Sequence, residues 1–420
     1  METDTTYFPS LADIKAAAER VSEIATVTPL APNFSYSKRY KADIFFKRED
    51  LQQVRSYKIR GAYNKISSLS AEEQERGVIC ASAGNHAQGV ALACARLNIQ
   101  GTIYMPAPTP KQKVEQVQMF GDTWIDIVLT GDTFDEANHA AQVASETQGS
   151  VMVPPFDDEK IIEGQATVGL EMIKQADPPL DYVFVPVGGG GLIAGLSTVF
   201  HLLSPSTKII GVEPHGAPAM KNSLEQGKNI SLDQIEKFVD GAAVQRVGDR
   251  NFKICQEFVE EVVTVHEGLV CQTILDLYNK EAIVVEPAGA LTIAALEHYG
   301  DRLEGKRVAC VVSGSNNDIT RTAEIKERAL LYRGLKHYFI IQFPQRAGAL
   351  KEFVAEILSP QDDITYFEYS KKTSREFAPA VVGIELEDKA DLEQLIQRMK
   401  HKGFFGEYLN DKPHLFEFLI

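Results

Sequence analysis

The chain has 420 residues, of which 44% are hydrophobic and 24% are charged, and its formal net charge is -15. This length predicts two or three domains, and the composition is that of an ordinary globular protein. The acidic balance argues against a nucleic-acid groove, which needs clustered Lys and Arg, and no apolar run approaches the roughly 20 residues that cross a bilayer.

The N-terminus and the cysteines indicate the compartment. The first 21 residues are acidic and then amphipathic, without the basic and apolar regions of a secretion signal. The five cysteines form no CxxC pair, and most lie among apolar neighbours, as in GVICAS and RVACVVSG. We therefore expect reduced, buried thiols in a cytoplasmic protein, with neither a disulfide framework nor a metal site.

Short β-rich runs alternate with longer helical segments from about residue 40 to 330. Eight runs are predicted strands: ADIFFK, GVICAS, GTIYMP, WIDIVLT, SVMVPP, DYVFVPV, KIIGVEP and RVACVVSG. Between them, segments such as NHAQGVALACARLN repeat apolar residues at three- and four-residue spacing. This alternation predicts an α/β, doubly wound domain over residues 1–330, in two lobes of which the smaller covers roughly residues 55–150.

The order of elements changes after a predicted linker at residues 331–336. Residues 337–420 read as strand, helix, strand, strand, helix and strand, with the last strand near LFEFLI. This is the βαββαβ order of a ferredoxin-like module. The module contains no convincing catalytic constellation, so it is better suited to binding or regulation.

A run of four glycines stands between a predicted strand and a predicted helix, in VFVPVGGGGLIAGLS. Gly188, Gly189, Gly190 and Gly191, followed by Leu192, let the backbone approach an anion closely at a helix N-terminus. The spacing fits neither a P-loop nor a dinucleotide fingerprint. A compact phosphate cradle is favoured over a purely structural turn.

Two further polar loops follow predicted strands. In CASAGNHAQG, Ser82, Gly84 and Asn85 suit a carboxylate ligand, although an ordinary helix start is the alternative and His86 alone is more often structural. In VVSGSNND, Ser313 stands at the end of a strand, where open parallel sheets bind ligands.

Lys58, in VRSYKIRGA, begins a predicted helix and by itself could be a solvated surface lysine. Together with a phosphate cradle and a carboxylate loop, however, a lysine in the same site suggests pyridoxal phosphate. This cofactor needs a lysine for its Schiff base and a partner for its ring nitrogen.

Five motifs in this order, SYKIRGA, SAGNHAQG, GGGGL, EPAGA and SGSN, resemble the threonine/serine dehydratase branch of the fold-type II, tryptophan-synthase-β-like pyridoxal-phosphate enzymes. The resemblance covers roughly residues 10–330. The tail resembles a single copy of the ACT-like regulatory domain found in biosynthetic threonine deaminases.

The resemblance implies a role for each motif. Lys58 would form the Schiff base and then accept the Cα proton, Asn85 would bind the pyridoxal 3′ oxygen, and Ser313 would meet the ring nitrogen. The loop from Gly188 to Leu192 would hold the phosphate. The substrate carboxylate would lie against the loop made of Ser82, Ala83, Gly84, Asn85 and His86.

Two departures from the related serine racemases are informative. Ala83 replaces the serine that carries a proton on the second face, which favours elimination over racemisation. Those racemases also bind a divalent ion beside an EP motif. Here Glu213 is present but Ala219 stands at the position of the aspartate ligand, so we assign no metal.

The resemblance therefore implies dehydration and deamination of L-threonine to 2-oxobutanoate and ammonia, the committed step of isoleucine biosynthesis. It also implies feedback control by isoleucine, with valine left open as a second effector, and a homodimer or homotetramer. The alternatives are an L-serine dehydratase, a threonine synthase or a β-replacement synthase, or an amino-acid sensor that has lost catalysis. The presence of Lys58 argues against the sensor.

Overall fold

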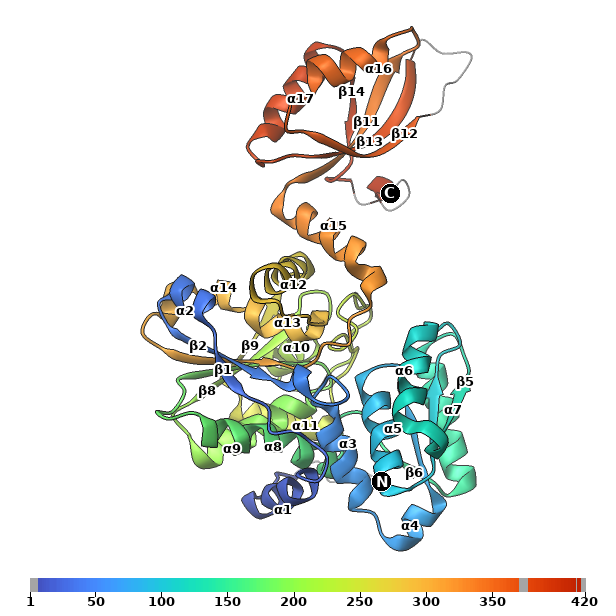
Figure 1. Ribbon diagram of the computed structural model, residues 1–420, viewed down its shortest axis with the longest axis vertical. Coiled ribbons are helices and arrows are strands. Elements are labelled where there is room, and N and C mark those ends of the chain that lie inside the picture. The colour runs from blue at the N-terminus through green and yellow to red at the C-terminus, as the bar shows by residue number, and fades with distance from the viewer. Residues whose placement is uncertain (1–6, 370–376, 413, 417–420) are drawn as a thin grey trace. The chain divides into compact units, whose positions relative to one another are not determined.

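The structure is a computed structural model that describes residues 7–369, 377–412 and 414–416. It divides into two compact units, Met1–Ile319 and Thr320–Ile420 (Figure 1). The predicted linker at 331–336 falls inside the second of these units, and the domain limits given above remain predictions. Within the described residues, we find no helix with the length and apolar character needed to span a membrane.

The larger sheet of the first unit has six strands in the order β1-β2-β10-β7-β8-β9. All neighbours are parallel except β1, which runs antiparallel to β2 at the edge. The strands are β1 (Leu30–Pro32), β2 (Asp43–Arg48), β7 (Tyr182–Pro186), β8 (Lys208–Pro214), β9 (Glu261–Val265) and β10 (Arg307–Val312).

The smaller sheet of this unit has four parallel strands in the order β5-β4-β3-β6. They are β3 (Val78–Ala81), β4 (Gly101–Met105), β5 (Ile125–Leu129) and β6 (Val151–Met152). All eight strands that the sequence predicts are confirmed, and so is the two-lobed fold with parallel sheets. The sequence missed β1 and β9, which are short and lie next to prolines or charged residues.

Helices cover both sheets (Figure 1). They are α1 (Leu11–Val21), α2 (Phe34–Tyr40), α3 (Lys58–Ser67), α4 (Ala71–Arg76), α5 (Asn85–Leu97), α6 (Lys111–Gly121), α7 (Phe134–Gln148), α8 (Glu159–Gln175), α9 (Gly191–Leu203), α10 (Ala219–Gln226), α11 (Asp249–Phe258), α12 (Glu267–Glu281), α13 (Pro287–Ala294) and α14 (Leu296–Tyr299). Short 3-10 turns include η1 (Glu49–Leu51), η2 (Asp122–Trp124) and η3 (Gly300–Leu303).

Helix α3 joins the two lobes of the first unit, because it packs against α8 on one side and α5 on the other. Glycines allow both close approaches. A Cβ on Gly164 of α8 would lie 2.6 Å from the Arg60 carbonyl oxygen, and one on Gly89 of α5 would lie 3.2 Å from the Lys58 carbonyl oxygen. The helix that begins at Lys58 is therefore fixed on both sides by backbone contacts.

A buried group of charged side chains ties α3 to the larger sheet. The Arg60 guanidinium donates two hydrogen bonds of 2.8 Å to Glu49 and one of 2.7 Å to Glu171 of α8. The Lys47 amine, on β2, donates to the second oxygen of Glu171 at 2.5 Å. Two positive charges thus face two carboxylates, which is the pairing that buried charges require.

The second unit begins with α15 (Thr322–Arg333) and continues as the predicted βαββαβ module. Its sheet has the order β12-β13-β11-β14, in which all neighbours are antiparallel. The elements are β11 (Lys336–Pro344), α16 (Ala349–Glu352), the π-helical turn η5 (Phe353–Ile357), β12 (Asp363–Tyr369), β13 (Phe377–Glu385), α17 (Asp391–His401) and β14 (Phe405–Tyr408).

One prediction for this unit is wrong. The last strand is β14, and Leu415 and Phe416 of the predicted LFEFLI strand lie in a helical turn, while residues 417–420 lie outside the described residues. Gly406 concealed β14, because glycine is depleted in strands. Here it is needed, since a Cβ would lie 2.5 Å from the Ile340 carbonyl oxygen on β11.

The close contact between α3 and α8 gives a prediction about stability. Gly164→Ala should lower the free energy of unfolding by about 1–3 kcal/mol, because the added methyl group meets backbone atoms that cannot rotate away. Urea unfolding followed by the fluorescence of Trp124, the one tryptophan of the sequence, would measure this in the first unit. Gln148→Ala, at an exposed position of α7, is the control and should have little effect. An unchanged midpoint for Gly164→Ala would contradict the prediction.

Candidate active site

The structure brings the five motifs together, and three of them, the loops after β3, β7 and β10, lie at the carboxyl ends of strands. Strands β7 and β10 are parallel neighbours, with Phe184 opposite Cys310. The glycine loop that follows β7 and the loop from Ser313 that follows β10 therefore leave the sheet side by side. Ligands bind at such strand ends in open α/β sheets.

Lys58 reaches this site from the first turn of α3. Its amine donates a hydrogen bond of 2.7 Å to the Pro155 carbonyl oxygen. Burial lowers the pKa of Lys58 to about 8, although the nearby Glu286 carboxyl acts in the opposite direction. An amine with this pKa is partly neutral near physiological pH, which both a nucleophile and a proton acceptor require.

The segment before Lys58 lies beside the loop that follows β10. Ser56 and Gly314 form an isolated antiparallel bridge, and the Tyr57 N–H donates to the Ser313 carbonyl oxygen at 3.2 Å. These backbone bonds place SYKIRGA and SGSN, which are more than 250 residues apart in the chain, in direct contact. The Ser313 hydroxyl is nearly buried and hydrogen-bonds to no described residue.

The SAGNH loop joins this group through Asn85. The Asn85 amide donates a hydrogen bond of 2.7 Å to the Glu286 carboxylate, and its oxygen accepts one from the Asn316 amide. The Glu286 N–H donates to the Gly314 carbonyl oxygen at 3.2 Å. EPAGA, SAGNH and SGSN are thus connected by hydrogen bonds around one carboxyl group.

Glu286 is a site residue that the sequence analysis missed, since EPAGA was noted there only as a motif. Glu286 is 5% exposed and is the N-cap residue of α13. Burial, followed by the charge of Asp240, raises the pKa of Glu286 to about 7. A glutamate directly before Pro at the start of an apolar helix was the available signal.

The glycine loop packs directly against the segment that holds Lys58. A Cβ on Gly189 would lie 2.1 Å from the Phe156 ring, and Gly190 has φ +92°, which favours glycine. Phe156 follows Pro155, whose carbonyl oxygen accepts the Lys58 bond. Asn251, also missed from the sequence, donates to the carbonyl oxygens of Gly189 and Phe156 and so joins the two segments.

The backbone N–H groups of Gly189 to Leu192 donate no hydrogen bond to any described residue. They lie at the start of α9, a helix of 13 residues, where N–H groups and the helix dipole favour an anion. A phosphate fits this loop. The free hydroxyl of Ser313 and the lowered pKa of Lys58 fit the other needs of pyridoxal phosphate, so the residues present are suited to that cofactor.

The loop between β3 and α5 is open at Gly84, where an added Cβ would meet no atom within 4 Å. Ser82, Ala83 and Gly84 are half-buried there. The His86 imidazole points away from it and hydrogen-bonds to the Val153 carbonyl oxygen at 2.9 Å. Burial and then the Lys58 charge lower the pKa of His86 to about 3, so its ring is neutral and has a structural role.

Glu213 lies at the end of β8, and its carboxylate accepts the N–H groups of Met220 and Lys221 at 2.7 and 2.9 Å. Burial raises the pKa of Glu213 to about 8. Backbone donors from the first turn of α10 therefore occupy this carboxyl group. That is a structural use for Glu213.

Comparison with known proteins places both units. A family model described as pyridoxal-phosphate dependent enzyme matches residues 21–314, and one described as the C-terminal regulatory domain of threonine dehydratase matches residues 327–419. The chain is 52% identical, over 97% of its length and 98% of the relative's, to a protein of Halalkalibacterium halodurans named biosynthetic L-threonine dehydratase IlvA. A protein of the same name from Bacillus subtilis is 51% identical over 97% of this chain and 96% of its own.

Among solved structures, the processed form of threonine deaminase isoform 2 from Solanum lycopersicum is similar to this chain, with a TM-score of 0.73 and 43% identity. The match covers 76% of this chain and 92% of that one.

The surroundings of Lys58 predict a pH dependence. In cofactor-free protein, acylation of the Lys58 amine by acetic anhydride, followed by peptide mass spectrometry, should rise with a midpoint near the pKa of about 8. Glu286→Gln should move the midpoint to lower pH, because the lost negative charge stabilised the ammonium form. Glu304→Gln, at an exposed position, is the control. A midpoint near that of a free lysine, about 10.4, would contradict the prediction.

Proposed function

The chain belongs to the pyridoxal-phosphate-dependent enzymes and carries the C-terminal regulatory domain of threonine dehydratase, and on this basis we propose that it converts L-threonine to 2-oxobutanoate and ammonia. The proposal rests on the two full-length relatives named for this activity and on the site around Lys58. In a biosynthetic pathway, this reaction commits threonine to isoleucine.

The observation that carries the proposal at the site is the position of the Lys58 amine. It is held by the Pro155 carbonyl oxygen, and its pKa of about 8 keeps a neutral fraction available. In that form the Nζ atom can attach the cofactor and later take the proton from the substrate Cα. Proton transfer is most effective when the pKa of the acceptor lies near the working pH.

Pyridoxal phosphate, when bound, supplies an electron sink for the negative charge that develops at Cα. We assign its phosphate to the N–H groups from Gly188 to Leu192, its 3′ oxygen to Asn85 and its ring nitrogen to the Ser313 hydroxyl. A hydroxyl, unlike a carboxylate, does not hold a proton on that nitrogen. This favours prompt loss of the β-hydroxyl over transamination.

We assign the substrate carboxylate to the loop from Ser82 to His86. The first N–H groups of α5 lie there, and the space beside Gly84 is open. Ala83 provides no hydroxyl that could return a proton to the opposite face of Cα. The loop therefore favours elimination over racemisation.

The reaction balances without an oxidant or a reductant. The Cα proton goes to Lys58, and the β-hydroxyl leaves as water after it gains a proton. One water molecule is then consumed when nitrogen is released as ammonia. L-threonine thus gives 2-oxobutanoate and ammonia, and L-serine would give pyruvate by the same route.

The second unit is a regulatory domain, and we propose isoleucine as its effector. A pocket with an empty volume of about 510 Å³, which includes open solvent at its mouth, lies between the end of β11, the start of α16 and β12. Phe343, Leu350, Phe367 and Tyr369 give it an apolar wall, and Arg346 provides a positive charge at its edge. An apolar side chain with a carboxylate matches these walls.

We also propose a homodimer or homotetramer in the cytoplasm. Phe34 on α2 and Tyr278 on α12 are 82% and 62% exposed, and a second copy that covered them would bury two large side chains. The five cysteines are free and buried, as expected in a reducing compartment.

The reaction is tested by the release of 2-oxo acid from L-threonine and from L-serine. We expect faster turnover of threonine, and we expect Lys58→Ala to lose turnover together with the visible absorbance of the bound cofactor. Asn98→Ala, at the exposed end of α5, should retain both. If the wild-type protein turned over O-acetylserine with sulfide, or phosphohomoserine, much faster than threonine, a related enzyme of the same fold would be the better assignment.

The effector site is tested by a matched pair of substitutions. Leu350 lines the pocket and Val354 does not, yet both are 47% exposed and four residues apart. Leu350→Ala should weaken isoleucine inhibition by about tenfold, the loss expected when about 1.4 kcal/mol of apolar contact is removed, while Val354→Ala should not. If isoleucine inhibited both variants and the wild type equally, the effector would bind somewhere other than this pocket.

A further inference from the structure

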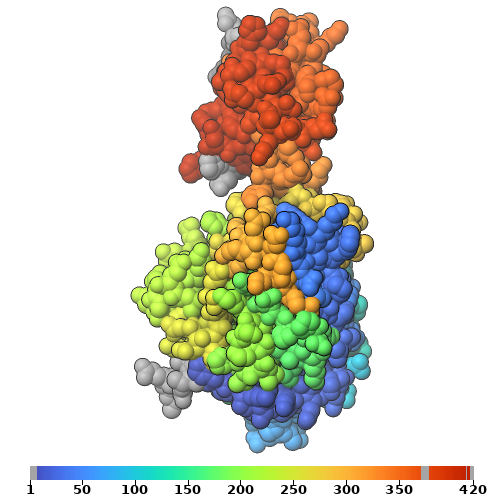
Figure 2. Space-filling model, turned by 90° about the vertical axis from the view of Figure 1, so that its left-hand side faces the viewer, coloured from blue at the N-terminus to red at the C-terminus, as the bar shows by residue number. Residues whose placement is uncertain are grey.

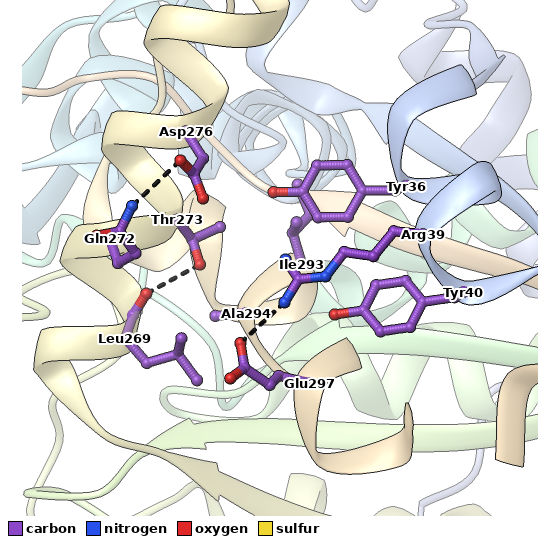
Figure 3. A pocket seen from close by; sticks show the side chains of 10 residues that line it. All are labelled: Tyr36, Arg39, Tyr40, Leu269, Gln272, Thr273, Asp276, Ile293, Ala294 and Glu297. Carbon is purple, nitrogen blue, oxygen red and sulfur yellow. Dashed lines mark hydrogen bonds and ion pairs between the residues drawn. The ribbon is translucent and has the colours of Figure 1, made fainter. Parts of the chain in front are cut away.

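A second group of polar side chains lies in the first unit, apart from the residues of the candidate active site. It surrounds a pocket between α2, α12 and the end of α13, with an empty volume of about 370 Å³ that includes open solvent at its mouth (Figure 3). Figure 2 shows the face of the unit on which α2, in blue, adjoins the orange segment around α14. Neither the reaction nor the regulatory domain described above uses this pocket.

The pocket has charges of both signs. On one side, the Arg39 guanidinium of α2 lies 3.4 Å from the Glu297 carboxylate, and each side chain is 52% exposed. On the other side, Asp276 of α12 lies 2.8 Å from Lys280 and accepts a hydrogen bond from Gln272. An exposed ion pair held by one long contact contributes little, so a ligand can replace Glu297 beside Arg39.

Two tyrosines form the wall between these charges. Tyr36 and Tyr40 are only 8% and 9% exposed, and their hydroxyls point into the pocket (Figure 3). Neither hydroxyl hydrogen-bonds to any residue in the described part of the chain. Burial raises the pKa of both phenols, so each keeps its proton and can donate a hydrogen bond to a ligand.

The floor of the pocket is apolar and belongs to elements that lead to the active site. Leu269 of α12 and Ile293 and Ala294 of α13 line it. Helix α13 starts directly after Glu286, so the pocket and the hydrogen bond from Asn85 to Glu286 lie at opposite ends of one helix of eight residues.

These features select among small ligands. A simple anion would face the two carboxylates, and a simple cation would face Arg39. A molecule with both charges satisfies both sides, and an aliphatic side chain suits the floor. We propose that this pocket binds a small aliphatic α-amino acid as its zwitterion. The carboxylate lies at Arg39 and the tyrosine hydroxyls, where it replaces Glu297, and the ammonium group lies at Asp276 on the other side.

The test uses the full-length holoenzyme and L-valine, which lacks a β-hydroxyl and is not dehydrated. Isothermal titration calorimetry of the wild type with L-valine should show a binding site at this pocket. This site is additional to any valine binding at the active site and at the regulatory unit. Arg39→Gln should weaken that site by about tenfold or more, since it removes a charge-assisted hydrogen bond. Arg302→Gln, also an exposed arginine beside a tyrosine ring, is the matched control and should leave it unchanged.

The second experiment uses isobutylamine, which is valine without its carboxylate, as a competitor of valine. It should not compete with valine for the site that Arg39→Gln weakens. Identical valine isotherms for the wild type and Arg39→Gln would overturn the proposal, and so would isobutylamine binding as tightly as valine. Because the readout is binding, it does not depend on which substrate the active site accepts. Gel filtration of each variant confirms that its assembly is unchanged.

Discussion

The position of α3 depends on the buried charges around Arg60. Burial alone would raise the pKa of Glu49, but the charge and hydrogen bonds of Arg60, together with the charge of Lys47 and the hydrogen bond from Thr28, outweigh it and keep the pKa of that carboxyl below its usual range. Removing one partner from such a group leaves a buried charge unpaired, which typically costs about 3–5 kcal/mol. The buried charges therefore hold α3 in one position. Apolar residues of the same volume could also stabilise the fold, but loss of a single charged partner could not be tolerated as easily.

The fixed position of α3 explains how Lys58 can be buried and still have an amine that loses its proton readily. Arg60 points toward the ionic group, on the side of the larger sheet, while Lys58 at the same helix start points to the Pro155 carbonyl oxygen. A neutral acceptor at Pro155 lets the amine lose its proton readily. A carboxylate in direct contact would have raised the pKa instead. Glu286 is close enough to influence Lys58, but its own carboxyl is shared with Asn85 and has a raised pKa.

The strands of the first unit and the loops of the candidate active site could be predicted from the sequence. Hydrophobic runs located eight strands, and glycine, serine and asparagine after those strands marked the loops that meet in the site. Contacts made by backbone atoms could not be predicted, because every residue has a carbonyl group. Pro155 is the clearest example, and the bridge from Asn251 to Gly189 is another. Glu286 was visible as a residue, but its meeting with Asn85 requires the fold, since 201 residues separate them.

The contact between Phe156 and the glycine loop has a consequence for sequence change over time. A side chain at Gly189 or Gly191 would have to displace Phe156, and the displaced segment carries the carbonyl group that orients Lys58. One mutation would then disturb both the loop assigned to the cofactor phosphate and the lysine assigned to its Schiff base. A mutation in the glycine loop that changes phosphate binding is therefore expected to change the reactivity of Lys58 as well. The two properties are coupled during evolution.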